Sequence, residues 1–202
     1  MTEEVIIAAE ISLIEADPLF GDVIKKQHIT PSEPSDDYFA SLVRSIIGQQ
    51  VSVAAARAIA QRFLEQTNMD AAKVITLTDD QIKSVGLSRQ KASYIRDLAQ
   101  HFVDDPEIYD HLETLSDDDV IAELTAVKGI GTWTAQMFLM FSLNRIDIFA
   151  PDDTGLQRAM MQLYKWDTLP PKKVLVVIAE KWQPYRTIAC MHLWHSLDNA
   201  PA

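Results

Sequence analysis

Hydrophobic residues recur every three or four positions along most of the chain, which is the spacing of one buried face of an α-helix. Several of these runs follow a residue that can cap a first helical turn, namely Thr78, Ser88, Ser116 and either Ser35 or Asp36, and the run from Ser52 is rich in alanine. The pattern predicts about ten helices, and the clearest lie at 35–50, 52–66, 78–86, 88–102, 116–127, 153–164, 170–182 and 184–197.

One stretch has the composition of a β-strand. The run VLVVIA at 174–179 is rich in β-branched residues, but its Pro-Pro-Lys-Lys start and its continuation to Trp182 favour a buried helix. No other segment reads as a strand, so the sequence predicts an all-α fold. The segment 29–37, with prolines at 31 and 34, is the best linker, and we expect the first helices to pack against the last.

The composition allows a sizeable core, since 48% of the 202 residues are hydrophobic. The start of the chain is acidic where a secretory signal would be basic, and no stretch reaches the roughly 18 apolar residues of a membrane span. We therefore expect an intracellular protein without a membrane partner, cytoplasmic in a bacterium or archaeon and nuclear in a eukaryote. The single cysteine, Cys190, rules out a cysteine-ligated iron–sulfur cluster and is expected in the core.

The net charge of −11 argues against a polyanionic partner, because Lys and Arg supply nonspecific affinity for nucleic acid. The charge is unevenly distributed, however. Basic residues gather in the middle of the chain, which permits a basic face on an acidic body: Arg44, Arg57, Arg62, Lys83, Arg89, Lys91, Arg96 and Lys128.

A glycine-containing turn, VKGIGTWTAQ at 127–136, joins two predicted helices. Gly129 and Gly131 permit a tight turn and the close approach of another backbone, and the helix that follows offers unpaired N–H groups. Such a turn either holds a phosphate or is an ordinary corner between helices. A second stretch of similar design, IKSVGLSRQKASYI at 82–95, either adds phosphate contacts through Ser88, Arg89 and Lys91 or forms a solvated basic face.

Four segments in the right order resemble the helix-hairpin-helix superfamily of base-excision DNA glycosylases. LTAVKGIGTWTAQMFLM at 124–140 resembles its hairpin, FAPDDTGLQRA at 149–159 lies where the family keeps its essential aspartate, and 38–63 is similar to its core helices. KWQPYRTIACMHLW at 181–194 is similar to the C-terminal helix of the alkylation-repair branch, DNA-3-methyladenine glycosylase II.

The resemblance extends from Asp36 to Leu197 and implies one domain with two helical lobes. One lobe is expected at 36–125, and the other at 1–35 plus 126–202, with a DNA cleft between them. The N-terminal α/β domain of some relatives is expected to be absent.

The resemblance also implies how DNA is held. The hairpin is expected to bind one strand of double-stranded DNA through its backbone, and Gln50 to enter the stack where a damaged base has been turned out. The expected DNA contacts are Gln49, Gln50, Lys128, Gly129, Ile130, Gly131, Thr132 and Thr134. No cofactor is required, although a Na⁺ or K⁺ ion on the hairpin carbonyls of Thr125, Val127 and Ile130 is possible in this family. The alternative for the two glutamines is a polar turn between helices.

Cleavage of an N-glycosidic bond leaves positive charge on the sugar, which a fixed carboxylate stabilises. The resemblance assigns this role to Asp153, which precedes Thr154 and opens a helix after Pro151. The alternative is that Asp152 or Asp153 only caps that helix. Relatives that also cut the strand carry a lysine where this chain has Trp133, so we expect a monofunctional hydrolase without lyase activity.

The expected base pocket consists of Trp133, Trp194, Met137 and Thr154. An alkylated purine is cationic, and an indole face attracts a cation. Well-known relatives carry aromatic residues at positions 137 and 154, so this pocket is expected to be more open.

The sequence therefore predicts a monomeric DNA repair glycosylase that flips out an alkylated purine, such as 3-methyladenine or 7-methylguanine, and leaves an abasic site. Three alternatives stay open at this point. They are a helix-hairpin-helix protein that binds DNA without chemistry, a glycosylase for an oxidised or deaminated base, and a helical protein-interaction domain, which only the acidic charge supports.

Overall fold

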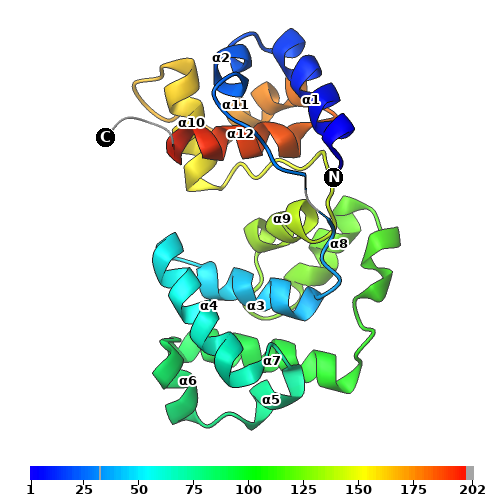
Figure 1. Cartoon of the computed structure of the whole chain (residues 1–202), viewed down its shortest axis with the longest axis vertical. Helices are drawn as coiled ribbons and strands as arrows, with labels where there is room; N and C mark the ends of the chain where they lie inside the picture. Colours follow the sequence, from blue (N-terminus) through cyan, green and yellow to red (C-terminus); the bar gives the residue numbers. More distant parts are fainter. Residues whose placement is uncertain (32, 199–202) are drawn as a thin grey trace. The chain divides into compact units, whose positions relative to one another are not determined.

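The computed structural model describes residues 1–31 and 33–198, and the regular secondary structure of these residues is entirely helical (Figure 1). The predicted all-α fold is confirmed, with twelve α-helices instead of about ten and no strand among the described residues. The helices are α1 Glu3–Ala16, α2 Phe20–Ile24, α3 Tyr38–Gly48, α4 Val53–Thr67, α5 Ala71–Thr76, α6 Asp79–Val85, α7 Arg89–Asp104, α8 Asp117–Thr125, α9 Thr132–Phe141, α10 Thr154–Tyr164, α11 Lys172–Ala179 and α12 Arg186–Asp198. Two short 3-10 helices cover Asp110–Thr114 and Glu180–Trp182.

The chain divides into two compact units. The central unit contains residues 35–138, and the terminal unit contains residues 1–34 and 139–202. The first boundary lies inside the segment predicted as a linker. The second lies in α9, so the hairpin residues 126–138 pack with the central unit, whereas the sequence interpretation grouped them with the terminal helices.

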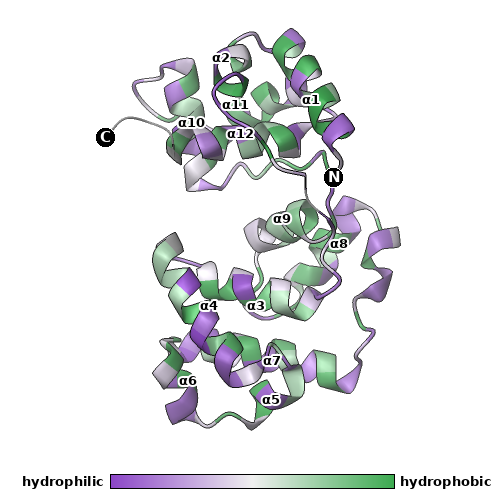
Figure 2. Ribbon diagram, viewed as in Figure 1, coloured by the Kyte–Doolittle hydropathy of each residue, from purple (hydrophilic) through white to green (hydrophobic). Residues whose placement is uncertain are grey.

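In the central unit α3 packs against α4 and α7, and α5 also packs on α7. One face of α3 is buried at Phe39, Leu42, Val43, Ile46 and Ile47. Hydrophobic and hydrophilic residues alternate around α4 and α7, as expected for helices with one face in a core (Figure 2). The hydrophobic spacing of the sequence therefore reports true burial in this unit.

The predicted caps are formed at three helices. Thr78, Ser88 and Ser116 each accept a hydrogen bond from the backbone N–H three residues later, and Ser52 caps α4 in the same way. The prediction for α3 was wrong, because Asp37 caps this helix and accepts from the backbone N–H of Ala40 at 2.8 Å. Ser35 and Asp36 precede the turn in which α3 begins, so they lie too far back to cap it.

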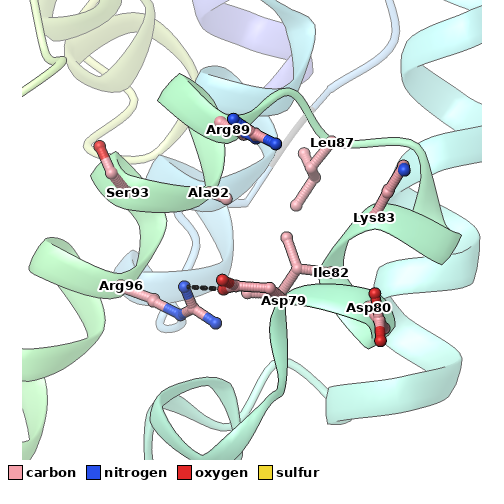
Figure 3. Close-up of a pocket in the computed structure, with 9 residues that line it drawn as sticks. All are labelled: Asp79, Asp80, Ile82, Lys83, Leu87, Arg89, Ala92, Ser93 and Arg96. Atoms are coloured by element: carbon pink, nitrogen blue, oxygen red, sulfur yellow. Dashed lines mark hydrogen bonds and ion pairs between the residues drawn. The ribbon is translucent and has the colours of Figure 1, made fainter.

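The second glycine turn, between α6 and α7, is also a helix–turn–helix. Gly86 adopts a positive φ of 95° and ends α6. A groove between these two helices contains both acidic and basic side chains (Figure 3). Arg96 Nη1 donates to Asp79 Oδ1 at 2.8 Å, while Lys83 and Arg89 lie at the far side of the groove. The opposite charges partly neutralise each other, so this groove is a weak candidate for an anion site.

In the terminal unit α1, α2 and α10 pack against α12. The prediction that the first helices pack against the last is therefore confirmed. Trp182 lies in the core, where Phe20 and Phe149 meet its ring edge-on at centroid distances of 5.1 and 5.8 Å. The run 174–179 is helical, within α11, and Cys190 is fully buried, as predicted.

Candidate functional site

The hairpin between α8 and α9 contains the two glycines, and the structure separates their roles. Gly129 adopts a φ of 87°, and a Cβ atom there would lie 2.2 Å from Cδ2 of Tyr94. Gly131 has open space around the corresponding position, and its carbonyl accepts from Ala135 at 3.0 Å in the first turn of α9. Gly129 is therefore required by the protein's own packing, whereas Gly131 leaves room for an external partner.

The hairpin is bonded directly to the junction between α3 and α4. Gln49 Nε2 donates to the carbonyl of Gly129 at 3.0 Å and to Thr134 Oγ1 at 3.3 Å. Gln50 is exposed and adopts a φ of 56°. The two neighbouring glutamines thus differ, because Gln49 bonds within the protein and Gln50 points to solvent.

A hollow in the central unit gathers five of the predicted DNA contacts with residues of the second helix–turn–helix. Its lining residues are Gln49, Gln50, Val51, Ser88, Gln90, Lys91, Tyr94, Gly129, Ile130 and Gly131. Of the other predicted contacts, Lys128 and Thr132 are exposed and lie on the hairpin. The side chains of Ile130 and Thr134 are buried. Ile130 can therefore contact DNA through its backbone alone, and the Thr134 side chain does not point outward.

Asp153 in the terminal unit is the N-cap of α10. Its Oδ1 atom accepts from the backbone N–H of Leu156 at 2.8 Å and from Nε1 of Trp194 at 2.9 Å. The N-terminal end of a helix stabilises a negative charge, so this position favours the carboxylate. Asp152 is exposed and forms an ion pair with Lys172. Asp153 is therefore the cap that the sequence left unassigned, and a second donor from another helix also holds it.

Sequence reasoning missed the bond between Trp194 and Asp153, because no local motif joins α12 to the start of α10. Phe141 packs at a tilt on the Trp194 indole, with ring centroids 5.9 Å apart, and it is 47% exposed. Gly155 lies against the same pair, since a Cβ there would be 3.0 Å from Asp153 Oδ1 and 3.2 Å from Trp194 Cδ1. The structure thus adds Phe141 and Gly155 to the residues around the candidate carboxylate.

The residues predicted for the base pocket come from both units. Trp133 and Met137 lie half-buried on α9 in the central unit, while Trp194 and Thr154 lie in the terminal unit. The pocket therefore stays a prediction, although the terminal unit does place Trp194 beside Asp153.

Across the residues that the structure describes, no group of three or more His, Cys, Asp or Glu side chains is arranged to hold a metal ion. Within the same residues, every helix is too short or too polar to span a bilayer.

The chain matches a known family and is similar in sequence to several of its relatives. Residues 43–184 match the HhH-GPD superfamily of base excision DNA repair proteins. DNA-3-methyladenine glycosylase 1 of Schizosaccharomyces pombe is 30% identical over 181 residues, which cover 87% of this chain and 78% of that protein. The Bacillus subtilis protein YfjP is 28% identical, over 84% of this chain and 62% of its own length.

The fold agrees with these sequence matches. The S. pombe 3-methyladenine DNA glycosylase Mag1, solved in complex with abasic DNA, superposes with a TM-score of 0.87 at 27% identity. The superposition covers 96% of this chain and 98% of that structure. The chain therefore belongs to the HhH-GPD superfamily of base excision DNA repair proteins, within the alkylation-repair branch that contains the DNA-3-methyladenine glycosylases.

Proposed function

We propose that this protein is a DNA glycosylase that hydrolyses the N-glycosidic bond of an alkylated purine in double-stranded DNA and leaves an abasic site. The observation that supports the proposal most directly is the carboxylate of Asp153. Two donors, from Leu156 and Trp194, hold it at the N-terminus of α10. The names of the family and of the fission yeast enzyme point to the same activity.

Asp153 stabilises the reaction electrostatically. As the base departs, the sugar acquires positive charge at its anomeric carbon, and a fixed carboxylate lowers the energy of that state. The two hydrogen bonds to Oδ1 restrict the rotation of the carboxylate, so little reorganisation is needed when the charge develops. The base leaves as a neutral molecule with the electron pair of the broken N-glycosidic bond, and water adds to the anomeric carbon and releases a proton to the solvent.

Alkylated purines such as 3-methyladenine and 7-methylguanine suit this site because they carry positive charge. A cationic base is a good leaving group, and the face of an indole attracts it. Trp194 lies next to the candidate carboxylate, and the partly exposed ring of Phe141 packs on it. Phe141 therefore joins Trp194 as an aromatic candidate for the part of the predicted base pocket that lies in the terminal unit.

The hairpin is the proposed binding site for the DNA backbone. Gly131 has free space around its Cα atom, and the N-terminal N–H groups of α9 follow it, which suits a phosphate of one strand. Trp133 occupies the position at which strand-cutting relatives keep a lysine, so the proposed reaction stops at the abasic site. No amine is available at that position to form a Schiff base with the sugar.

The proposed hydrolysis is written without a cofactor, because a cationic base is a good leaving group and Asp153 stabilises the charge that develops on the sugar. A Na⁺ or K⁺ ion on the carbonyls of Thr125, Val127 and Ile130 is a separate part of the proposal. These residues lie at the C-terminal end of α8 and in the hairpin, where the helix dipole favours a cation. The intracellular location and the monomeric state stay predictions from the sequence.

Release of methylated bases from alkylated duplex DNA tests the proposal. The wild-type protein should release 3-methyladenine or 7-methylguanine, and Asp153→Asn should slow release by about 100-fold or more, as for other fixed electrostatic groups. Asp152→Asn is the matched control and should retain the wild-type rate. Strands should break only after alkali, and borohydride should trap no protein–DNA adduct. An inactive wild-type protein, or equal rates for wild type and Asp153→Asn, would contradict the assignment.

A further inference from the structure

The junction between α3 and α4 holds Gln50 in an unusual backbone conformation. Gln49 is the C-cap of α3, Ser52 is the N-cap of α4, and Gln50 between them has a φ of 56°. A residue other than glycine occupies this left-handed region only when its surroundings hold it there. Because the side chain of Gln50 is exposed, the restraint has to act on the backbone.

Lys91 supplies this restraint from α7. Its Nζ atom donates to the carbonyl of Gln49 at 2.5 Å and to the carbonyl of Ile47 at 2.8 Å. The carbonyl of Gln49 belongs to the peptide group that joins Gln49 to Gln50. The ammonium therefore fixes the peptide plane from which Gln50 turns outward, and the C-terminal end of α3 favours a cation at this place.

Both ends of this contact are anchored. The backbone N–H of Lys91 donates to the capping hydroxyl of Ser88 at 3.2 Å, and α7 packs along α3. Burial lowers the pKa of Lys91, because the ammonium gives up water to reach the two carbonyls. On the other side, the amide of Gln49 is bonded to Gly129 and Thr134 of the hairpin. The junction is thus held by α7 and by the hairpin together.

We propose that Lys91 is a positioning residue for Gln50. It holds the α3–α4 junction so that the Gln50 side chain can enter a duplex from which a base has been turned out. The inference rests on the proposed function, since it concerns the same DNA substrate. The two hydrogen bonds of the Lys91 ammonium go to backbone carbonyls at the junction, so its loss should impair the step that uses Gln50 and should leave the chemistry at Asp153 unchanged.

The test uses the full-length protein and four variants. Lys91→Met removes the donors while keeping an unbranched side chain, and Lys91→Arg keeps a charged donor. Gln50→Ala removes the inserted side chain. Lys83→Met is the matched control, because Lys83 lies in the groove of Figure 3 and away from the junction. Circular dichroism confirms that each variant is folded, and Lys91→Gln, which removes the charge and shortens the side chain but keeps it polar, replaces Lys91→Met if that variant does not fold.

The first measurement needs no catalysis. A duplex carries an abasic-site analogue beside 2-aminopurine, whose fluorescence rises when the base stack is opened. Wild type and Lys83→Met should raise the signal equally, while Lys91→Met and Gln50→Ala should each reduce the rise to about a third or less, since unstacking then lacks its inserted group. An unchanged signal with Lys91→Met would overturn the proposal.

The second measurement is single-turnover release of the alkylated base. Lys91→Met should slow release by about tenfold, as for one lost charge-assisted hydrogen-bond donor, and Lys91→Arg should restore most of the rate. The double variant Lys91→Met with Gln50→Ala should be no slower than Gln50→Ala alone, because the two residues act in one step. Losses that multiply in the double variant would show that Lys91 acts elsewhere and would overturn the inference.

The two hypotheses fail in different ways. A wild-type protein that opens the base stack in a Lys91-dependent manner but releases no base would refute the proposed function and leave the role of Lys91 standing. Base release by wild type with no effect of Lys91→Met on the fluorescence would do the reverse.

Discussion

Replacing Gly129 by alanine should destabilise the central unit substantially. The new Cβ atom would lie 2.2 Å from Cδ2 and 2.3 Å from Cγ of Tyr94, well inside any normal contact. Cγ and Cδ2 are the ring atoms nearest the backbone, so they cannot move aside as the end of a flexible side chain would. The hydroxyl of Tyr94 also accepts a hydrogen bond from Gln90 at 2.7 Å, which further restrains the ring.

The expected cost has two parts. A non-glycine residue at a φ of 87° costs about 1–2 kcal/mol. Displacing a packed ring costs about 1–3 kcal/mol, as for other overpacked sites. A loss of about 3 kcal/mol in the free energy of unfolding lowers the melting temperature by roughly 6–12 °C for a protein of this size.

Urea unfolding followed by circular dichroism measures this loss. Gly131→Ser is the control, because open space surrounds Gly131 and serine is a good residue for the start of a helix. Its stability should change by less than about 0.5 kcal/mol, while its affinity for duplex DNA falls. Combining Gly129→Ala with Tyr94→Ala should cost less than the sum of the two single changes, because the clash is relieved. A loss below about 1 kcal/mol for Gly129→Ala would refute the packing argument, since backbone strain alone should reach that value.

Two further predictions concern the terminal unit. Trp194→Phe keeps an aromatic ring but removes the donor to Asp153. Base release should therefore slow by about tenfold or more, as for a lost hydrogen bond to a charged group, and the affinity for DNA should not change. An unchanged rate of release would show that the indole N–H does not position the carboxylate. His192 is buried, and burial is the main cause that lowers its pKa to about 4. The neutral imidazole therefore stabilises the fold above pH 6.5, and this contribution is lost as the pH falls toward 4. Relative to pH 8, the free energy of unfolding should fall by about 2 kcal/mol at pH 5 in wild type and not in His192→Phe, as measured by urea unfolding at both pH values; equal falls would exclude His192 as the cause. Oε1 of Glu10 lies 3.2 Å from Nε2 of His192, and the raised pKa of Glu10 acts in the opposite direction, so it reduces the fall expected in wild type.

Local features of the fold follow from the sequence alone. Most helices and three of their caps were predicted correctly, because a cap is a contact between residues three positions apart and needs only suitable neighbours. The start of α3 was misplaced because three adjacent residues can all cap a helix, and only the three-dimensional position of the first turn selects Asp37. The family could be identified because its motifs are short and continuous in sequence.

The contacts that shape the candidate site depend on the tertiary structure instead. The bond from Gln49 to Gly129 spans 80 positions, and the bond from Trp194 to Asp153 spans 41, so no local pattern indicates either of them. The two hairpin glycines show the difference most directly. They look equivalent in sequence, but Tyr94 packs against Gly129 while the space around Gly131 is open. The sequence determined that the chain turns tightly here, and only packing between distant helices decided which glycine serves the fold and which is left to face a partner.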